Sequence, residues 1–155
     1  MDRIEKQVLL KASLDRVWRA VSDSREFGTW FGMAIDGPFV AGTVVSAVIT
    51  PTTVDDDVAA RQQPHAGQPS PLQIVAVEPK RRLAFRWNAL PGSDGTTLVE
   101  FTLTETDDGV RLDIVESGFD ALPDDVRTSV FDGNSEGWST QTNLVRKYLE
   151  LVDQV

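Results

Sequence analysis

The sequence predicts an α+β fold in which a curved antiparallel β-sheet packs around a long C-terminal helix. Its 155 residues fit a single domain over 1–155, since domains cluster near about 100–150 residues. Segments with the two-residue alternation of strands gather in the middle of the chain, and segments with helical periodicity lie near its two ends. This grouping is typical of α+β proteins, because parallel α/β sheets alternate strands with helices.

The N-terminal part predicts one strand and two short helices. Apolar residues alternate over about 1–10, which indicates a half-buried strand. Ser13 is a favourable N-cap, and the apolar residues after it recur at helical spacing, so a helix is expected at once. Residues 22–28 predict a second short helix that ends at Gly28.

About five further strands are expected, which gives a sheet of about six strands. Each candidate segment is rich in β-branched or aromatic residues, and most of them alternate. The Asp107-Asp108-Gly109 turn marks an antiparallel hairpin between the last two. The candidate strands are 43–50, 72–77, 82–87, 96–104 and 110–116.

The final segment predicts a helix over 135–152, long enough to cover a sheet. Two polar residues, Gln141 and Thr142, lie on its apolar stripe. An unpaired buried amide costs about 1–3 kcal/mol, so these side chains either bond locally or face a polar cavity. The apolar stripe consists of Trp138, Val145, Leu149 and Val152, with Tyr148 at its edge.

The composition excludes several classes of function. The chain has no cysteine and one histidine, so thiol catalysis, cysteine-based metal centres and disulfides are excluded, and we expect no metal or cofactor. The formal net charge of −9 repels nucleic acid. No stretch reaches the roughly 18 apolar residues of a membrane span, and the first residues lack the apolar core of a signal peptide, so a cytoplasmic protein is expected.

Two segments, 133–137 and 51–71, are candidates for a catalytic motif and for a lid, respectively. Residues 133–137 match the pattern G-x-S-x-G, but no histidine follows Ser135, so we interpret this segment as a helix start capped by Ser135 or Asn134. The proline-rich stretch 51–71 is longer than the loops of a compact domain usually are. It is either a mobile surface insertion or a lid, in which Val54, Val58 and Ala59 would form a helical turn.

Glu116 continues the inward phase of the apolar residues in the strand 110–116. The register therefore predicts a carboxylate at the mouth of the space that sheet and helix enclose. Because Glu116 ends the strand, bending into water is the alternative.

Several blocks resemble the SRPBCC (START-like, Bet v 1-like) superfamily, and more narrowly its branch named after the activator of the 90 kDa heat-shock chaperone's ATPase. In the N-terminal half these are Leu14–Asp23 and Trp30-Phe31-Gly32. In the C-terminal half they are Glu116–Phe119, Gly137-Trp138 and Tyr148–Glu150. The resemblance implies a helix-grip fold with a deep apolar cavity between sheet and helix. Members bind lipids, sterols, polyketides or other hydrophobic molecules, and related branches include cyclases.

The leading hypothesis is a non-enzymatic protein that binds a small hydrophobic ligand, lipid-like or aromatic. One alternative is a protein–protein module that acts on a chaperone or stress partner, and another is a polyketide cyclase or aromatase-like enzyme that uses Glu116. The same aromatic residues would also suit a solid core. The candidate ligand-binding residues are Trp30, Phe31, Phe85, Trp87, Phe101, Leu112, Glu116, Phe119, Trp138, Gln141, Thr142, Val145 and Leu149.

Overall fold

The computed structural model describes residues 2–89 and 95–152. Within them the chain forms a seven-stranded sheet in the order β1-β7-β6-β5-β4-β3-β2, and every neighbouring pair is antiparallel. The α+β class is confirmed. The strands are β1 (Arg3–Leu10), β2 (Met33–Asp36), β3 (Val44–Ile49), β4 (Leu72–Glu78), β5 (Arg82–Trp87), β6 (Thr97–Thr106) and β7 (Gly109–Ser117).

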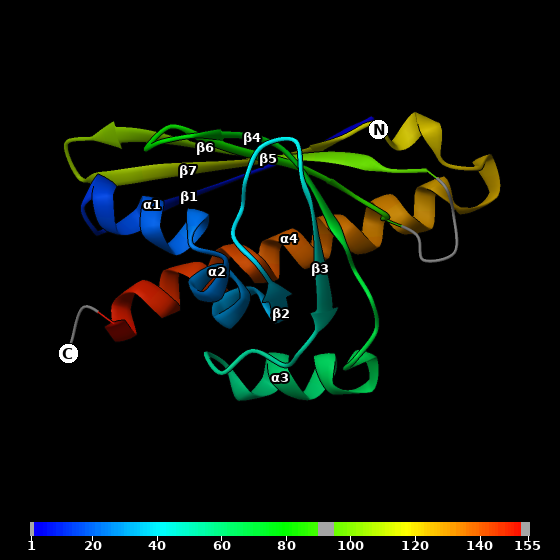
Figure 1. Cartoon of the computed structure of the whole chain (residues 1–155), viewed down its shortest axis with the longest axis horizontal. Helices are drawn as coiled ribbons and strands as arrows, with labels where there is room; N and C mark the ends of the chain where they lie inside the picture. Colours follow the sequence, from blue (N-terminus) through cyan, green and yellow to red (C-terminus); the bar gives the residue numbers. More distant parts are fainter. Residues whose placement is uncertain (1, 90–94, 153–155) are drawn as a thin grey trace.

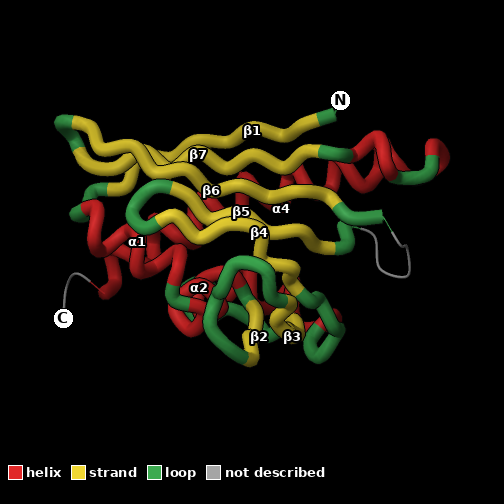
Figure 2. The backbone as a smooth tube through the Cα atoms, turned by 45° about the horizontal axis from the view of Figure 1, so that its top comes forward, coloured by secondary structure: helices red, strands yellow, loops and turns green. Residues whose placement is uncertain are grey.

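Helices α1, α2 and α4 lie on one side of this sheet, and the longest of them, α4, runs along its length, whereas α3 lies away from the main sheet, beyond the end of β3 (Figure 1). Strands β1 and β4 to β7 lie side by side, whereas the β2–β3 pair turns away from them (Figure 2). Two pairs of residues in register join β3 to β4, so the β2–β3 hairpin extends beyond the main sheet. The helices are α1 (Leu14–Ser22), α2 (Ser24–Phe31), α3 (Asp56–Gln62) and α4 (Asp124–Val152), with 3₁₀ turns η1 (Gln63–His65) and η2 (Phe119–Ala121).

Helix α1 starts where its cap predicts. The Ser13 hydroxyl accepts a hydrogen bond from the Arg16 backbone N–H at 3.2 Å. The prediction that α2 ends at Gly28 is wrong, because α2 continues to Phe31 and ends at Gly32, whose φ is 101°. Gly28 instead serves close packing: a Cβ there would lie 2.2 Å from the Met33 carbonyl oxygen.

The sheet has one strand more than expected, because β2 was not predicted. Its four residues are too few to show a periodicity, and β2 forms by pairing with β3, where Met33 stands opposite Ile49.

The start predicted for the last helix is wrong, because α4 begins at Asp124 rather than at Ser135. Asn134 and Ser135 therefore lie inside the helix and do not cap it. Gly133 and Gly137 obscured the helix, since each glycine disfavours a helix interior by about 1 kcal/mol. Packing of α4 on the sheet compensates for that cost.

The stretch 51–71 is folded. The Asp55 carboxylate caps α3 by accepting from the backbone N–H groups of Asp57 at 3.0 Å and Val58 at 3.1 Å. The Val58 side chain is buried. Of the residues that the lid hypothesis placed in a helical turn, Val58 and Ala59 lie in α3, whereas Val54 precedes it.

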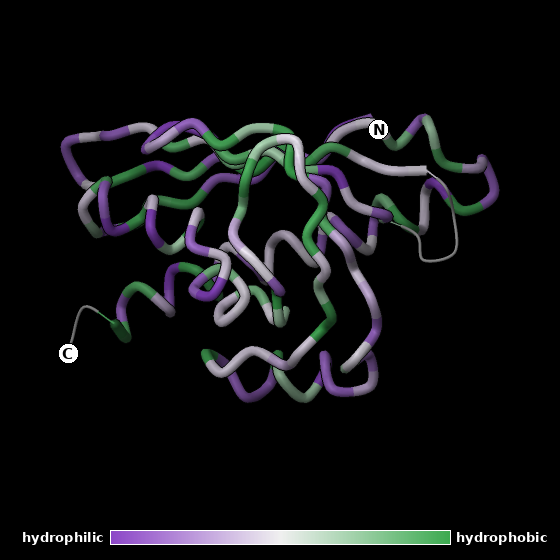
Figure 3. Tube along the Cα trace, in the orientation of Figure 1, coloured by the Kyte–Doolittle hydropathy of each residue, from purple (hydrophilic) through white to green (hydrophobic). Residues whose placement is uncertain are grey.

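A continuous apolar core fills the space between the sheet, α1, α2 and the C-terminal half of α4. Phe27 lies at its centre and makes ring contacts with Trp30, Phe85 and Phe101 at centroid distances of 5.0, 6.2 and 5.9 Å. Hydrophobic stretches follow the strands, and the turn between β6 and β7 is hydrophilic (Figure 3). The core extends along the sheet from Leu10 and Val17 to Phe119 and Leu122, and the pocket lies beside it against the middle of α4.

Candidate functional site

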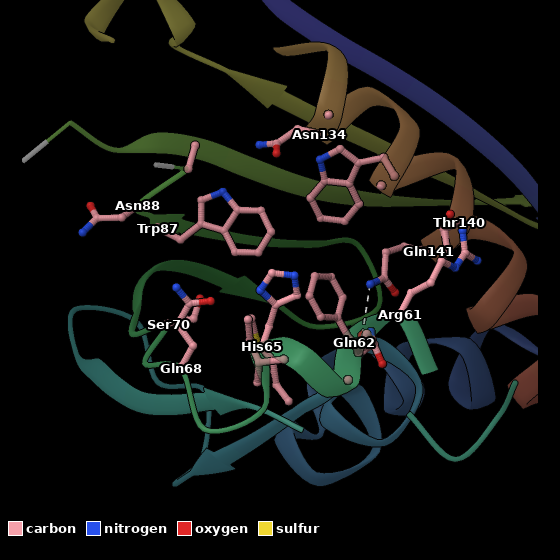
Figure 4. Close-up of a pocket in the computed structure, with 18 of the residues that line it drawn as sticks. Arg61, Gln62, His65, Gln68, Ser70, Trp87, Asn88, Asn134, Thr140 and Gln141 are labelled. Atoms are coloured by element: carbon pink, nitrogen blue, oxygen red, sulfur yellow. Dashed lines mark hydrogen bonds between the residues drawn. The ribbon is translucent and has the colours of Figure 1, made fainter. Parts of the chain in front are cut away.

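A pocket of about 720 Å³ opens between the α3 segment, the end of β5 and the middle of α4 (Figure 4). The segment 68–71, which follows η1, completes its wall. This volume lies within the roughly 300–1,000 Å³ of pockets that bind small molecules. The stretch 51–71 therefore contributes a wall to the pocket.

Three aromatic rings form the apolar end of the pocket. The indoles of Trp87 and Trp138 are stacked at 5.6 Å with an interplanar angle of 28°. The Phe31 ring meets Trp87 and Trp138 edge to face, at 5.9 and 5.8 Å. This corner combines a flat face with an edge, which suits a planar apolar group.

One buried carboxylate holds both indoles. Glu116, which is 0% exposed, accepts from Trp87 Nε1 at 2.8 Å on Oε2 and from Trp138 Nε1 at 2.9 Å on Oε1. It also accepts from Thr97 Oγ1 at 2.5 Å and from Asn134 Nδ2 at 3.0 and 3.2 Å. The burial of an ionised carboxylate is tolerable only with such a full set of donors.

Glu116 lies behind the aromatic corner, whereas sequence reasoning placed it at the mouth of the enclosed space. It does not line the pocket. Its inward direction follows the register of β7, as the alternation indicates. Its role in this geometry is to orient Trp87 and Trp138.

The structure separates the predicted ligand-binding residues into two groups. Phe31, Trp87, Trp138 and Gln141 line the pocket. Thr142 does not, and its hydroxyl donates to the Ser139 carbonyl at 2.8 Å, within its own helix. The others are buried in the core, outside the pocket lining, namely Trp30, Phe85, Phe101, Leu112, Phe119, Val145 and Leu149.

Gln141 spans from α4 to the end of α2. Its Nε2 donates to the Phe31 carbonyl at 3.0 Å, and its Oε1 is buried without a partner among the described residues. Gln62 on α3 donates to the same carbonyl at 3.1 Å. One backbone oxygen therefore ties α2, α3 and α4 together below the pocket.

Two glycines of α4 leave room for the pocket. Gly133 and Gly137 both line it, and a Cβ added at either would meet no atom within 4 Å. They are four residues apart and so lie on one face of the helix. Sequence reasoning missed this role, although the i, i+4 spacing of two glycines in a helix was the available signal.

The α3 wall is anchored by polar contacts. Lys147 Nζ lies 2.6 Å from Asp55 Oδ2, which links α4 to the N-cap of α3. This hydrogen bond, with the backbone donors at the cap, lowers the pKa of Asp55 below its ordinary value. Thr52 Oγ1 donates to the Thr29 carbonyl at 3.0 Å. Helix α3 is thus held over the pocket mainly by bonds at its two ends.

The described residues contain no group of three or more His, Asp or Glu side chains arranged to hold a metal ion. In the same part of the chain, no helix is long and apolar enough to cross a membrane.

The seven-stranded antiparallel sheet around a long C-terminal helix is a helix-grip fold. A family model described as activator of Hsp90 ATPase homolog 1-like protein matches residues 11–150. The chain belongs to this family. A search of curated protein sequences found no match.

Solved structures share the fold. Protein BH1534 from Bacillus halodurans is 26% identical, with a TM-score of 0.69 over 96% of this chain and 99% of that one. The Aha1 dimer from Colwellia psychrerythraea is 15% identical, with a TM-score of 0.71 over 97% of each chain. DynU16, a putative protein in the dynemicin biosynthetic locus, is 25% identical with a TM-score of 0.70. The match covers 97% of this chain and 48% of DynU16, so this chain spans about half of that protein's length.

Proposed function

We propose that this protein binds a small hydrophobic molecule with a planar aromatic part in the pocket between α3, β5 and α4. The observation that carries the proposal is that three aromatic residues in mutual contact, Phe31, Trp87 and Trp138, line the pocket where the core ends. Aromatic residues normally turn such faces toward a packed core. Here they line a pocket, and apolar faces of this kind are favourable ligand contacts.

The two pocket glycines support this proposal. A helix of this length gains about 1 kcal/mol from alanine in place of each interior glycine. The chain nevertheless has glycine at positions 133 and 137, both of which line the pocket. The lost helix stability has a reason if the space beside the two glycines accommodates a ligand.

The site geometry favours binding over acid–base catalysis by Glu116. Both carboxylate oxygens already accept hydrogen bonds from side chains, and the residue is fully buried behind the indoles. A general acid or base must reach a proton of the substrate within about 2.6–3.2 Å or through one water. A ligand in the pocket would meet the faces of Trp87 and Trp138 first.

The test uses N-phenyl-1-naphthylamine, an uncharged dye that fluoresces in apolar surroundings. We expect saturable binding to the wild-type protein. Gly137→Leu should weaken it at least about tenfold, which corresponds to about 1.4 kcal/mol, because the leucine takes up pocket volume and its Cβ meets no atom within 4 Å. Ser139→Leu adds the same side chain at an exposed position of the same helix outside the pocket, and should change nothing.

Two results would contradict the proposal. One is the absence of dye binding, together with a native mass spectrum that shows only the mass of the free chain. The other is equal affinity of the wild-type protein and Gly137→Leu, which would place any bound dye elsewhere.

A further inference from the structure

We propose that the natural ligand is an organic anion, an aromatic or aliphatic body with one acidic group, and that Arg61 and His65 recognise this group. The inference rests on the proposed function and adds the chemical class of the ligand. It follows from the charge distribution around the pocket, the state of its polar side chains and the positions of the two basic residues.

The pocket differs in charge from the rest of the chain. The sequence has 24 acidic against 15 basic residues, with a formal net charge of −9. None of the described residues that line the pocket is Asp or Glu, and the basic ones among them are Arg61 and His65. A surface this acidic repels anions in general, so a carboxylate-free lining with a cation is the place where an anion is accepted.

Arg61 has no polar partner among residues 2–89 and 95–152. It forms no ion pair or side-chain hydrogen bond with any described residue, whereas most other arginines do, such as Arg16 and Arg82. Arg61 is also exposed, so its guanidinium reaches the pocket without first being released from a carboxylate. A free guanidinium fork matches a carboxylate in geometry and charge.

Arg61 lies near the end of α3 and His65 ends the η1 turn that follows, and both line the pocket. In Figure 4, His65 lies on the Trp87 side of the pocket and Arg61 on the side of Gln141 and Thr140. The two basic side chains come from α3 and η1, and the aromatic corner comes from α2, β5 and α4. The pocket therefore has an apolar end and a basic wall.

Three of the five amide side chains that line the pocket already donate within the protein, and Gln68 and Asn88 are neutral donors. Gln62 and Gln141 both donate to the Phe31 carbonyl, and Asn134 donates to Glu116. A polar group of the ligand therefore finds its strongest available donors in Arg61 and His65. A neutral ligand would leave the Arg61 charge unused.

The test compares two dyes that share the N-phenylnaphthylamine skeleton. 8-Anilinonaphthalene-1-sulfonate carries one negative charge, and N-phenyl-1-naphthylamine carries none. Arg61→Gln should weaken binding of the sulfonate about tenfold and leave the neutral dye unchanged. His65→Gln should act in the same direction with a smaller effect. Arg3→Gln removes the same charge from β1, outside the pocket lining, and should alter neither dye.

The outcomes are distinguishable. If the neutral dye binds and Arg61→Gln weakens both dyes equally or neither, the anion inference is wrong and the proposed function stands. If neither dye binds the wild-type protein, the proposed function fails with it. Unchanged melting temperatures of the variants, whose altered side chains are exposed, exclude misfolding as the cause.

Discussion

The indole Nε1–H of Trp138 donates to Glu116 Oε1 across 2.9 Å, and both side chains are buried. The bond joins the middle of α4 to the end of β7. Because Trp87 on β5 donates to the other oxygen of the same carboxylate, one charge fixes two rings of the pocket wall. The shape of the pocket thus depends on a residue that does not line it.

Glu116→Gln should destabilise the protein by about 1–3 kcal/mol. Glutamine keeps the volume but replaces one acceptor oxygen with an amide donor, which would face a donor of Trp87, Thr97, Asn134 or Trp138. Urea unfolding measures the loss, and the near-ultraviolet circular dichroism of the tryptophans should change with it. Glu136→Gln, at an exposed position of α4, is the control and should stay within about 0.5 kcal/mol. Equal stability of the two variants would contradict the role of the carboxylate.

The same substitution should have opposite effects at two helical glycines. Gly28→Ala should cost about 1–3 kcal/mol, because the new Cβ would lie 2.2 Å from a backbone oxygen that has little freedom to move. Gly133→Ala should stabilise by about 0.4–1 kcal/mol, since the added methyl meets open space and the unfolded chain loses freedom. Thermal and urea unfolding of both variants test this, and effects of the same sign would disagree with the packing of α2.

Lys147→Met should loosen α3 while leaving global stability nearly unchanged. The variant removes the ion pair to Asp55 but keeps the aspartate as N-cap. Hydrogen exchange of the α3 amides should become severalfold faster, because locally anchored segments open independently of the core. Arg146→Met breaks a neighbouring exposed pair with Glu150 and should leave α3 exchange unaltered. Slow exchange in both variants would mean that other contacts hold α3 in place.

Acidic pH should also speed hydrogen exchange of the α3 amides. The Lys147 ion pair and the backbone donors of the cap lower the pKa of Asp55 in the folded protein. The ionised carboxylate therefore stabilises α3 fully above the ordinary pKa near 4. This contribution is lost as the pH falls through the depressed pKa. Exchange in α3, corrected for the intrinsic rate, should accelerate in this acidic range in the wild-type protein and much less in Lys147→Met.

Tyr148 should titrate above the ordinary tyrosine value of about 10. Burial raises its pKa, and so does the hydrogen bond that its hydroxyl donates to Glu26 Oε1 at 2.6 Å, while Arg16 opposes the shift. The neutral phenol stabilises the fold below pH about 10, and this contribution is lost as the pH rises through the raised pKa. The chain has one tyrosine, so absorbance at the tyrosinate band reports this group alone.

Glu26→Gln provides the comparison for Tyr148. Removal of the carboxylate takes away a charge that disfavours tyrosinate and leaves Arg16 nearby, so the midpoint should fall. An unchanged midpoint would mean that burial alone sets the pKa.

Local sequence patterns predicted most of the sheet. Strand β5 runs over the same residues, Arg82–Trp87, that its alternation indicated. Strands β6 and β7 differ from their predictions at the ends only. A period of two is a local property, because successive side chains of a strand point to opposite faces. Strand β2 and the first half of α4 were missed, because pairing with β3 and packing on the sheet stabilise them.

The aromatic residues of the site were identified from the sequence, but their division between pocket and core was not. Phe85 and Trp87 occupy alternate positions on the same face of β5, and no local signal separates a buried ring from one that lines a pocket. The separation depends on Gly133 and Gly137, which α4 brings opposite the end of β5, and on α3, which lies across the opening. Arg61 and His65 join the site for the same reason, since the stretch 51–71, for which the sequence left a mobile insertion and a lid both open, contributes a wall of the pocket.

The sequence by itself determined an acidic, cysteine-free α+β domain with a long C-terminal helix, because composition and hydrophobic periodicity are properties of the chain alone. It left two directions open for Glu116, inward or into water. The tertiary structure decided that Glu116 holds Trp87 and Trp138 and that a pocket remains beside them. These features depend on contacts between residues far apart in the chain, and such contacts exist only after sheet, α3 and α4 have packed together.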